Sequence, residues 1–168
     1  MEIKNVKMFV LDYEANATFD RLKATLDNFV KCLRKKYSIV PIVIISKIQM
    51  YLEFHDEVYI ANEKKVRKYQ KDYVKKSNDE NLYYIDGAKV LGKSNISEKT
   101  VDGCHPTDYG FISMAEYLYH ILTKITSFPI ETILFQLTIV LLLKNSEFNI
   151  LLGIFSISIL LFIFRSSP

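Results

Sequence analysis

The segment of residues 102–106 contains the residue types in this sequence that are best suited to chemistry. It reads Asp-Gly-Cys-His-Pro, so that Asp102 precedes His105 by three residues. In a turn, such a carboxylate can hydrogen-bond the imidazole, fix its tautomer and stabilise the imidazolium formed in catalysis. Gly103 permits a tight backbone and Pro106 stiffens the exit. The segment predicts that His105 acts as a general base and is hydrogen-bonded to Asp102. The alternative is an ordinary loop histidine beside a turn residue.

Three apolar runs predict the strands that position this loop, and periodic apolar residues predict the helices between them. The expected strands are residues 6–11, 39–45 and 81–86, and the expected helices are residues 18–36, about 56–76, and a last helix that begins at Thr107. In the second helix the apolar stripe is Val58, Ala61, Val66, Tyr69 and Tyr73. Residues 87–99 are expected to form a loop. This order predicts an α/β fold with a parallel sheet and helices on both faces.

The C-terminal part of the chain differs from the rest, because charged residues almost disappear after about Lys124. We expect a domain over residues 1–126 and an apolar helical tail over residues 127–168. The tail's two apolar runs, residues 128–143 and 148–164, would each be roughly 24–26 Å long as helices, slightly short of a hydrocarbon core of about 30 Å. The interpretation is membrane association through residues 128–164, as one helix or a hairpin; the alternative is two helices buried against the protein.

Composition limits the partners and the compartment. The net charge of +3 and the mixing of basic with acidic residues give no indication of nucleic-acid binding. The two cysteines, Cys32 and Cys104, imply no disulfide framework, and no secretory signal is visible at the N-terminus. We therefore expect a reduced, cytoplasmic setting apart from the membrane-associated tail.

The string VDGCHPTDYGFISMAEYL closely resembles the last block of the SGNH, or GDSL-like, hydrolase family. Asp102, His105, Pro106, Gly110 and Met114 match that block. Upstream, KMFVLDYEAN resembles the family's strand and oxyanion block, where Asn16 matches the asparagine that donates its amide to the oxyanion. The resemblance covers roughly residues 6–122. It implies a partial three-layer, flavodoxin-like parallel sheet with flanking helices, and a serine ester hydrolase that needs no cofactor or metal.

Two features depart from the family pattern. The oxyanion block, commonly Gly-x-Asn-Asp, reads Glu-Ala-Asn-Ala over residues 14–17, so that only Asn16 is retained. Asn16 also suits the alternative of a helix cap before Thr18. No Gly-Asp-Ser segment, which carries the family's nucleophile, occurs in the 168 residues.

Other residues are weaker candidates for the missing chemistry. Ser46 ends a predicted strand but lacks the glycine-containing turn that exposes a nucleophile, and the side chain of Cys104 is expected to point away from the adjacent His105. A metal site formed by Asp102, His105 and Asp108 is less favoured than the hydrogen-bonded Asp102–His105 pair, because the surrounding sequence matches a metal-free family.

The resemblance implies an acyl or acetyl esterase, with esters on carbohydrates among its substrates. His105 would be the general base, Asp102 would orient it, and Asn16 would hold the oxyanion. The chain alone is expected to be inactive without a serine block, and the alternative is a non-catalytic, membrane-associated remnant.

In the family's strand order, the strand at residues 6–11 would lack its neighbour. We therefore expect an exposed sheet edge, exposed apolar side chains and strand pairing with another chain.

Overall fold

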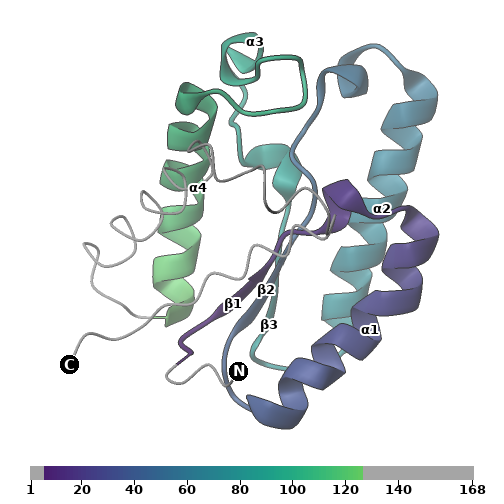
Figure 1. The fold of residues 1–168 in the computed structure, drawn as a ribbon, viewed down its shortest axis with the longest axis vertical. Coiled ribbons are helices and arrows are strands. Elements are labelled where there is room, and N and C mark those ends of the chain that lie inside the picture. The colour runs from purple at the N-terminus through teal and green to yellow at the C-terminus, as the bar shows by residue number, and fades with distance from the viewer. Residues whose placement is uncertain (1–5, 127–168) are drawn as a thin grey trace, which may run out of the picture. The chain divides into compact units, whose positions relative to one another are not determined.

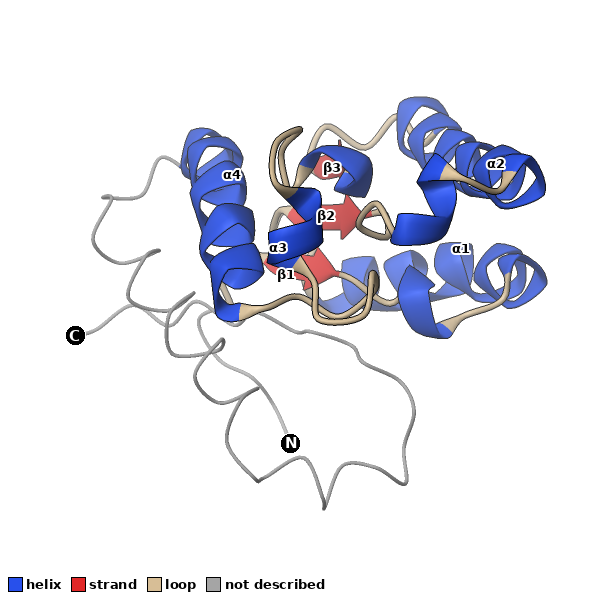
Figure 2. Cartoon of the chain, turned by 90° about the horizontal axis from the view of Figure 1, so that it is seen from above, coloured by secondary structure: helices blue, strands red, loops and turns tan. Residues whose placement is uncertain are grey.

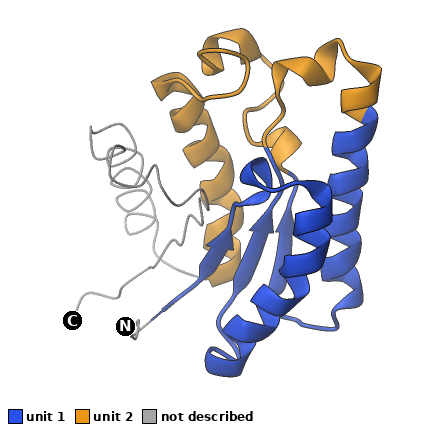
Figure 3. Ribbon diagram, turned by 45° about the vertical axis from the view of Figure 1, so that its right-hand side comes forward, with its two compact units in different colours: residues 1–47, 61–86, 158–168 blue, residues 48–60, 87–157 orange. Residues whose placement is uncertain are grey.

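The computed structural model describes residues 6–126 and divides them into two compact units (Figure 3). The first unit contains residues 6–47 and 61–86, and the second contains residues 48–60 and 87–126. The expected domain boundary at residue 126 and both apolar runs of the tail concern residues outside the described part. Within residues 6–126, no helix combines the length and the apolar character that a membrane span requires.

The first unit is built on a three-stranded parallel sheet in the order β1-β2-β3 (Figure 1). The strands are β1 (Phe9–Leu11), β2 (Ile42–Ile45) and β3 (Leu82–Ile85), with α1 (Phe19–Lys36) and α2 (Glu57–Lys76) as the intervening helices. Each strand lies inside a predicted apolar run. The prediction of an α/β fold with a parallel sheet and flanking helices is confirmed.

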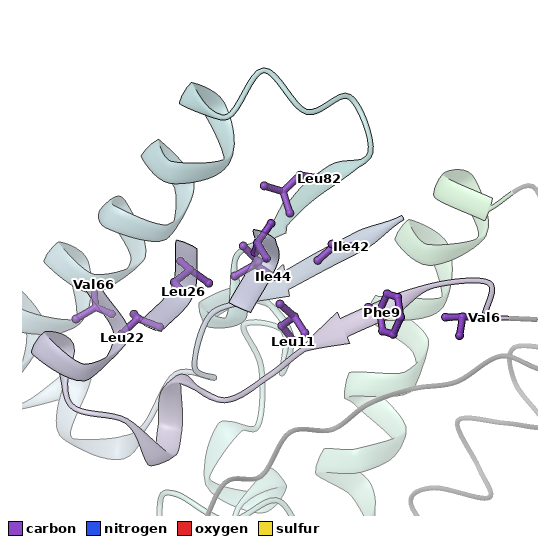
Figure 4. Close-up of a cluster of buried hydrophobic side chains, with 10 residues drawn as sticks. Val6, Phe9, Leu11, Leu22, Leu26, Ile42, Ile44, Val66 and Leu82 are labelled. Atoms are coloured by element: carbon purple, nitrogen blue, oxygen red, sulfur yellow. The ribbon is translucent and has the colours of Figure 1, made fainter. Parts of the chain in front are cut away.

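Helices α1 and α2 pack on the same face of the sheet (Figure 2), whereas the order of elements in the sequence predicted crossover helices on both faces. Each new strand is added on the same side of the previous one, so that two right-handed crossovers leave both helices on one face. Leu22, Leu26 and Val30 of α1 and Val66 of α2 form a buried cluster with Phe9, Leu11, Ile42, Ile44 and Leu82 from the strands (Figure 4).

The buried side of α2 agrees in part with the predicted apolar stripe, because Val66 is buried and Tyr69 and Tyr73 pack against the buried cluster. Val58 is 73% exposed, and the buried residues of the helix are Glu63, Val66 and Gln70. Glu63 is buried because Lys47 Nζ donates a hydrogen bond of 2.6 Å to its carboxylate. A buried ion pair therefore lies on this helix at a position that the predicted stripe did not include.

Strand β1 lies at an edge of the sheet within residues 6–126, since it pairs there with β2 and with no second strand. Its side chains are nevertheless buried: Phe9, Val10 and Leu11 are each 1% exposed. The expectation of exposed apolar side chains is therefore wrong for this strand, while pairing with another chain stays a prediction.

The second unit consists of short helical turns and one long helix, α4 (Asp108–Thr126). The turns are η2 (Tyr51–Phe54), η3 (Gly87–Lys89) and α3 (Ile96–Lys99), and α3 contacts α4. Two of these turns, η3 and α3, fall in the segment 87–99 that was expected to be a loop. Thr107 starts α4 as predicted, because its hydroxyl accepts a hydrogen bond of 3.1 Å from the backbone N–H of Gly110.

Candidate active site

The loop of residues 100–106 is closed into a ring by backbone contacts. Thr100 and Pro106 form an isolated antiparallel bridge, and the backbone N–H of Val101 donates a hydrogen bond of 2.8 Å to the carbonyl of His105. Next to the ring, Thr107 N–H donates to the carbonyl of Lys99 at 2.9 Å. The ring therefore fixes the ends of the segment that carries Asp102 and His105.

Two glycines allow close packing around this ring. Gly103 has φ +81°, and a Cβ on it would lie 2.5 Å from Cβ of Tyr51; the backbone N–H of Tyr51 donates to the Gly103 carbonyl at 2.8 Å. Gly110 lies in the first turn of α4, where a Cβ would lie 2.1 Å from the carbonyl oxygen of Lys99. The ring is thus held on one side by the segment that starts η2 and on the other by α4.

Buried Lys99 adds a further connection to the ring. Its ammonium group donates a hydrogen bond of 2.6 Å to the carbonyl of Leu91 and lies 5.2 Å from the ring centroid of Tyr109. A cation near an aromatic face is attracted by the ring quadrupole. Lys99 therefore joins the segment before the ring to the start of α4.

Asp102 uses its two carboxylate oxygens for different contacts. Oδ1 accepts hydrogen bonds from the backbone N–H groups of Cys104, at 2.9 Å, and His105, at 2.8 Å, and Oδ2 lies 2.7 Å from Nδ1 of His105. These hydrogen bonds, led by that from the His105 backbone, lower the pKa of the Asp102 carboxyl to about 2. The carboxylate is therefore ionised at neutral pH and oriented toward the imidazole.

The same contact leaves the other ring nitrogen of His105 available. Because an ionised carboxylate only accepts, Nδ1 carries the proton in the neutral imidazole, and that tautomer leaves the lone pair on Nε2. Within residues 6–126, Nε2 has no hydrogen-bond partner, and the His105 side chain is 77% exposed. The arrangement can accept a proton from a group that approaches Nε2 from solvent or from another segment.

The side chain of Cys104 lies close to this pair. The ligand atoms of Asp102, Cys104 and His105 all lie within 4.8 Å of one another, and Asp108 does not belong to this group. The expectation that Cys104 points away from His105 is therefore wrong, since the turn at Gly103 folds the three side chains together.

Asn16 is the last residue of the turn η1 (Glu14–Asn16) in the first unit. It is exposed, and its side-chain amide has no hydrogen-bond partner within residues 6–126. The N-cap of α1 is Thr18, whose Oγ1 accepts a hydrogen bond of 3.3 Å from the N–H of Arg21. The alternative role of Asn16 as the helix cap is therefore wrong, and the expected proximity of Asn16 to His105 stays a prediction.

Glu14, which the sequence analysis gave no role, fastens this turn to the sheet. It is buried directly after β1, and its Oε2 accepts a hydrogen bond of 2.8 Å from the backbone N–H of Lys47, just beyond β2. Burial raises the pKa of the Glu14 carboxyl, and Glu63 adds to the increase. No sequence pattern indicates this contact, because its partner is a backbone group 33 residues away.

Ser46 does not have the environment of a nucleophile. It is fully buried at the end of β2, and its Oγ accepts a hydrogen bond of 3.1 Å from the phenol of Tyr84. Burial raises the pKa of that phenol to about 12, so that it acts as a neutral donor at ordinary pH. These contacts assign Ser46 a packing role at the end of the strand.

A groove of about 280 Å³ lies in the second unit, and Tyr51, Phe54, His55 and Thr100 are among its lining residues. Tyr51 and His55 pack together with ring centroids 4.6 Å apart and ring planes tilted by 49°, and both Tyr51 and Phe54 are about half exposed. The groove adjoins the ring of residues 100–106, because Thr100 belongs to both and Tyr51 contacts Gly103. Sequence reasoning missed these aromatic residues, which showed no helical or strand periodicity.

A parallel α/β sheet combined with a loop that pairs a carboxylate with an imidazole defines a class that includes many acyl-transfer enzymes. The chain belongs to the GDSL-like Lipase/Acylhydrolase family, whose model matches residues 1–123. None of the curated proteins compared with the chain matches it.

Two solved structures resemble the chain. One, from Bacteroides ovatus ATCC 8483, is described as a GDSL-like lipase; it is 29% identical, with a TM-score of 0.63 over 72% of this chain and 36% of that one. The other, the salicylyl-acyltransferase SsfX3 from a tetracycline biosynthetic pathway, is 21% identical, with a TM-score of 0.57 over 74% of this chain and 39% of that one, and it supports the fold alone. The chain thus spans well under half the length of either structure.

Proposed function

We propose that this chain supplies the Asp–His base of a GDSL-type ester hydrolase whose nucleophilic serine comes from outside these 168 residues. The observation that carries the proposal is the 2.7 Å contact between Asp102 Oδ2 and His105 Nδ1, in a ring that leaves Nε2 open to an approaching hydroxyl. The match of residues 1–123 to the family supports it.

In the proposed reaction, Nε2 of His105 accepts the proton of the serine hydroxyl as its oxygen attacks the ester carbonyl. Asp102 stabilises the imidazolium, which then protonates the leaving alcohol; water completes the cycle by the same route. The amide of Asn16 donates a hydrogen bond to the oxyanion. The substrates are acyl or acetyl esters, including those on carbohydrates, and the groove beside Tyr51 and Phe54 accommodates an apolar part of the ester.

The test compares the chain alone with the same chain joined at its N-terminus to a segment that carries the family's Gly-Asp-Ser block, taken from the upstream DNA where that DNA encodes one. We expect the joined protein to react with a fluorophosphonate ester and to hydrolyse an activated acetyl ester. In it, His105→Ala should lower kcat by about 10⁶ and Asp102→Asn by about 10⁴, the losses seen when such triads lose the histidine or the aspartate.

The matched control is His120→Ala, which removes an exposed histidine from α4 and should leave the activity unchanged. Equal activity in His105→Ala and in the unaltered joined protein would refute the proposal. If no Gly-Asp-Ser segment is encoded upstream, the same variants are tested by mixing the chain with a separately expressed serine-containing segment.

One observation favours a second function: no Gly-Asp-Ser segment occurs in the 168 residues, although the Asp–His pair is retained. In this alternative, the chain is a non-catalytic remnant that associates with membranes through residues 128–164. It requires that the joined protein stays unlabelled and that the full chain sediments with lipid vesicles.

A further inference from the structure

The ring of residues 100–106 brings three kinds of metal ligand together at the surface. The carboxylate of Asp102, the thiol of Cys104 and the imidazole of His105 have ligand atoms within 4.8 Å of one another. Neither cysteine of the chain is in a disulfide. The proposed hydrolase uses the carboxylate and the imidazole but gives the thiol no role.

The spacing of these atoms is close to what a tetrahedral zinc ion requires. With bonds of about 2.0–2.1 Å to nitrogen and oxygen and about 2.3 Å to sulfur, ligand atoms lie about 3.4–3.6 Å apart. The observed separations extend from 2.7 Å, between Asp102 Oδ2 and His105 Nδ1, to at most 4.8 Å. Shifts of roughly 1 Å, within reach of side-chain rotation in this exposed loop, complete the geometry.

The loop is also held in place in a way that survives binding. Oδ1 of Asp102 stays anchored by the backbone N–H groups of Cys104 and His105, so that Oδ2 alone has to exchange the imidazole for a metal ion. The carbonyl of Gly103 remains fixed by Tyr51 N–H. The backbone that carries the ligands therefore requires little reordering when an ion binds.

We propose that Asp102, Cys104 and His105 form a zinc site, with water in the fourth position. A thiolate combined with an imidazole favours zinc over magnesium or calcium, which prefer oxygen ligands. On binding, the thiol releases its proton to the buffer, the imidazole proton moves from Nδ1 to Nε2 through exchange with water so that Nδ1 can bind the metal, and zinc keeps its oxidation state. Because a metal between Oδ2 and the ring breaks the Asp102–His105 hydrogen bond, an occupied site silences the base; this consequence alone rests on the proposed function.

The test uses the full chain with reduced thiols and Co²⁺ as a spectroscopic stand-in for zinc. We expect one Co²⁺ per chain, an absorption band from thiolate-to-metal charge transfer, and loss of that band when Zn²⁺ is added. Cys104→Ser should abolish the band and weaken binding by at least about tenfold, since even second-shell changes at metal sites cost about 10–100-fold. Asp102→Asn should weaken binding while keeping the band.

The matched control is Cys32→Ser, which removes the exposed cysteine of α1 and should leave the band and the affinity unchanged. Circular dichroism is used to check that Cys104→Ser and Cys104→Ala keep the fold. A band that persists in both folded variants, a band that Cys32→Ser removes, or a chain that gives no band would each overturn the zinc site. None of these outcomes depends on the presence of a serine, so that they leave the proposed hydrolase function to its own test.

Discussion

Gly103 determines the geometry of the Asp–His ring at the scale of single residues. Its φ of +81° lies in the left-handed region, and its missing side chain leaves space for Tyr51. Both properties follow from the absence of a Cβ. The turn at Gly103 lets Oδ1 of Asp102 accept from two consecutive backbone N–H groups while Oδ2 faces the imidazole.

We predict that Gly103→Ala destabilises the protein clearly more than Gly92→Ala does. Both glycines have positive φ, +81° and +74°, so that alanine at either position costs about 1–2 kcal/mol from backbone strain. Only at Gly103 does the new Cβ also meet another side chain, at 2.5 Å from Tyr51 Cβ. The measurement is the free energy of unfolding in urea for the two variants and the unaltered chain.

Gly92→Ala is the control for strain without collision, because the nearest atom to its Cβ is the flexible Lys99 Nζ at 3.5 Å. Hydrogen exchange at the Tyr51 amide adds a local readout, and this amide should lose protection in Gly103→Ala alone. An equal loss of unfolding free energy in the two variants would contradict the prediction, because it would mean that Tyr51 moves aside with no measurable loss of stability.

At the scale of elements, the sequence predicts well those features that depend on near neighbours. Continuous apolar runs located all three strands, and periodicity located α1 and α4, because burial leaves a regular pattern in the chain. The Asp102–His105 contact was also predictable, since the two residues are three apart. The turn η1 was not, because Glu14 is fixed by the backbone of Lys47 and the sequence shows no sign of that contact.

We predict that the free energy of unfolding of Glu14→Gln, compared with that of the unaltered chain at the same pH, becomes more favourable as pH rises above about 4.5. Burial raises the folded-state pKa of Glu14 above the ordinary value of 4.5, so that the folded chain holds this proton more tightly than the unfolded chain. The contribution of Glu14 to the free energy of unfolding is therefore full below pH 4.5 and is lost as pH rises through the folded-state pKa. Glutamine keeps an oxygen acceptor for Lys47 N–H and does not titrate.

The measurement is urea unfolding of both proteins at a series of pH values. Glu80→Gln controls for the removal of one negative charge, because Glu80 is exposed. Curves of stability against pH that stay parallel for Glu14→Gln and the unaltered chain would contradict the prediction.

At the scale of the whole molecule, the described residues form two units, and the chain spans 36% of the length of the 29%-identical structure. The apolar sequence of the tail predicts membrane association, but local pattern alone does not distinguish a membrane helix from a buried one. The prediction of a sheet edge at β1 came from the family's strand order, and within residues 6–126 β1 pairs with β2 alone.

We predict that residues 1–126, expressed without the tail, self-associate in detergent-free buffer. An edge strand presents backbone N–H and C=O groups that favour pairing with a second chain. Size-exclusion chromatography with light scattering should give a dimer or larger species whose share grows with protein concentration. A monomer at every concentration, with a cooperative and high thermal transition, would contradict this expectation.

The ring of residues 100–106 is assembled from contacts that lie within the second unit, namely the Thr100–Pro106 bridge, the Tyr51–Gly103 hydrogen bond and the space at Gly110. The geometry of the ring is therefore fixed by contacts within one unit of this chain. It does not depend on the segment that would supply the serine hydroxyl in the proposed function. Under the proposed function, a protein that carries this ring without a serine has no turnover and still holds the Asp102–His105 pair in place. Restoring activity would then require that a serine-containing segment docks beside His105, while the ring itself would not have to refold.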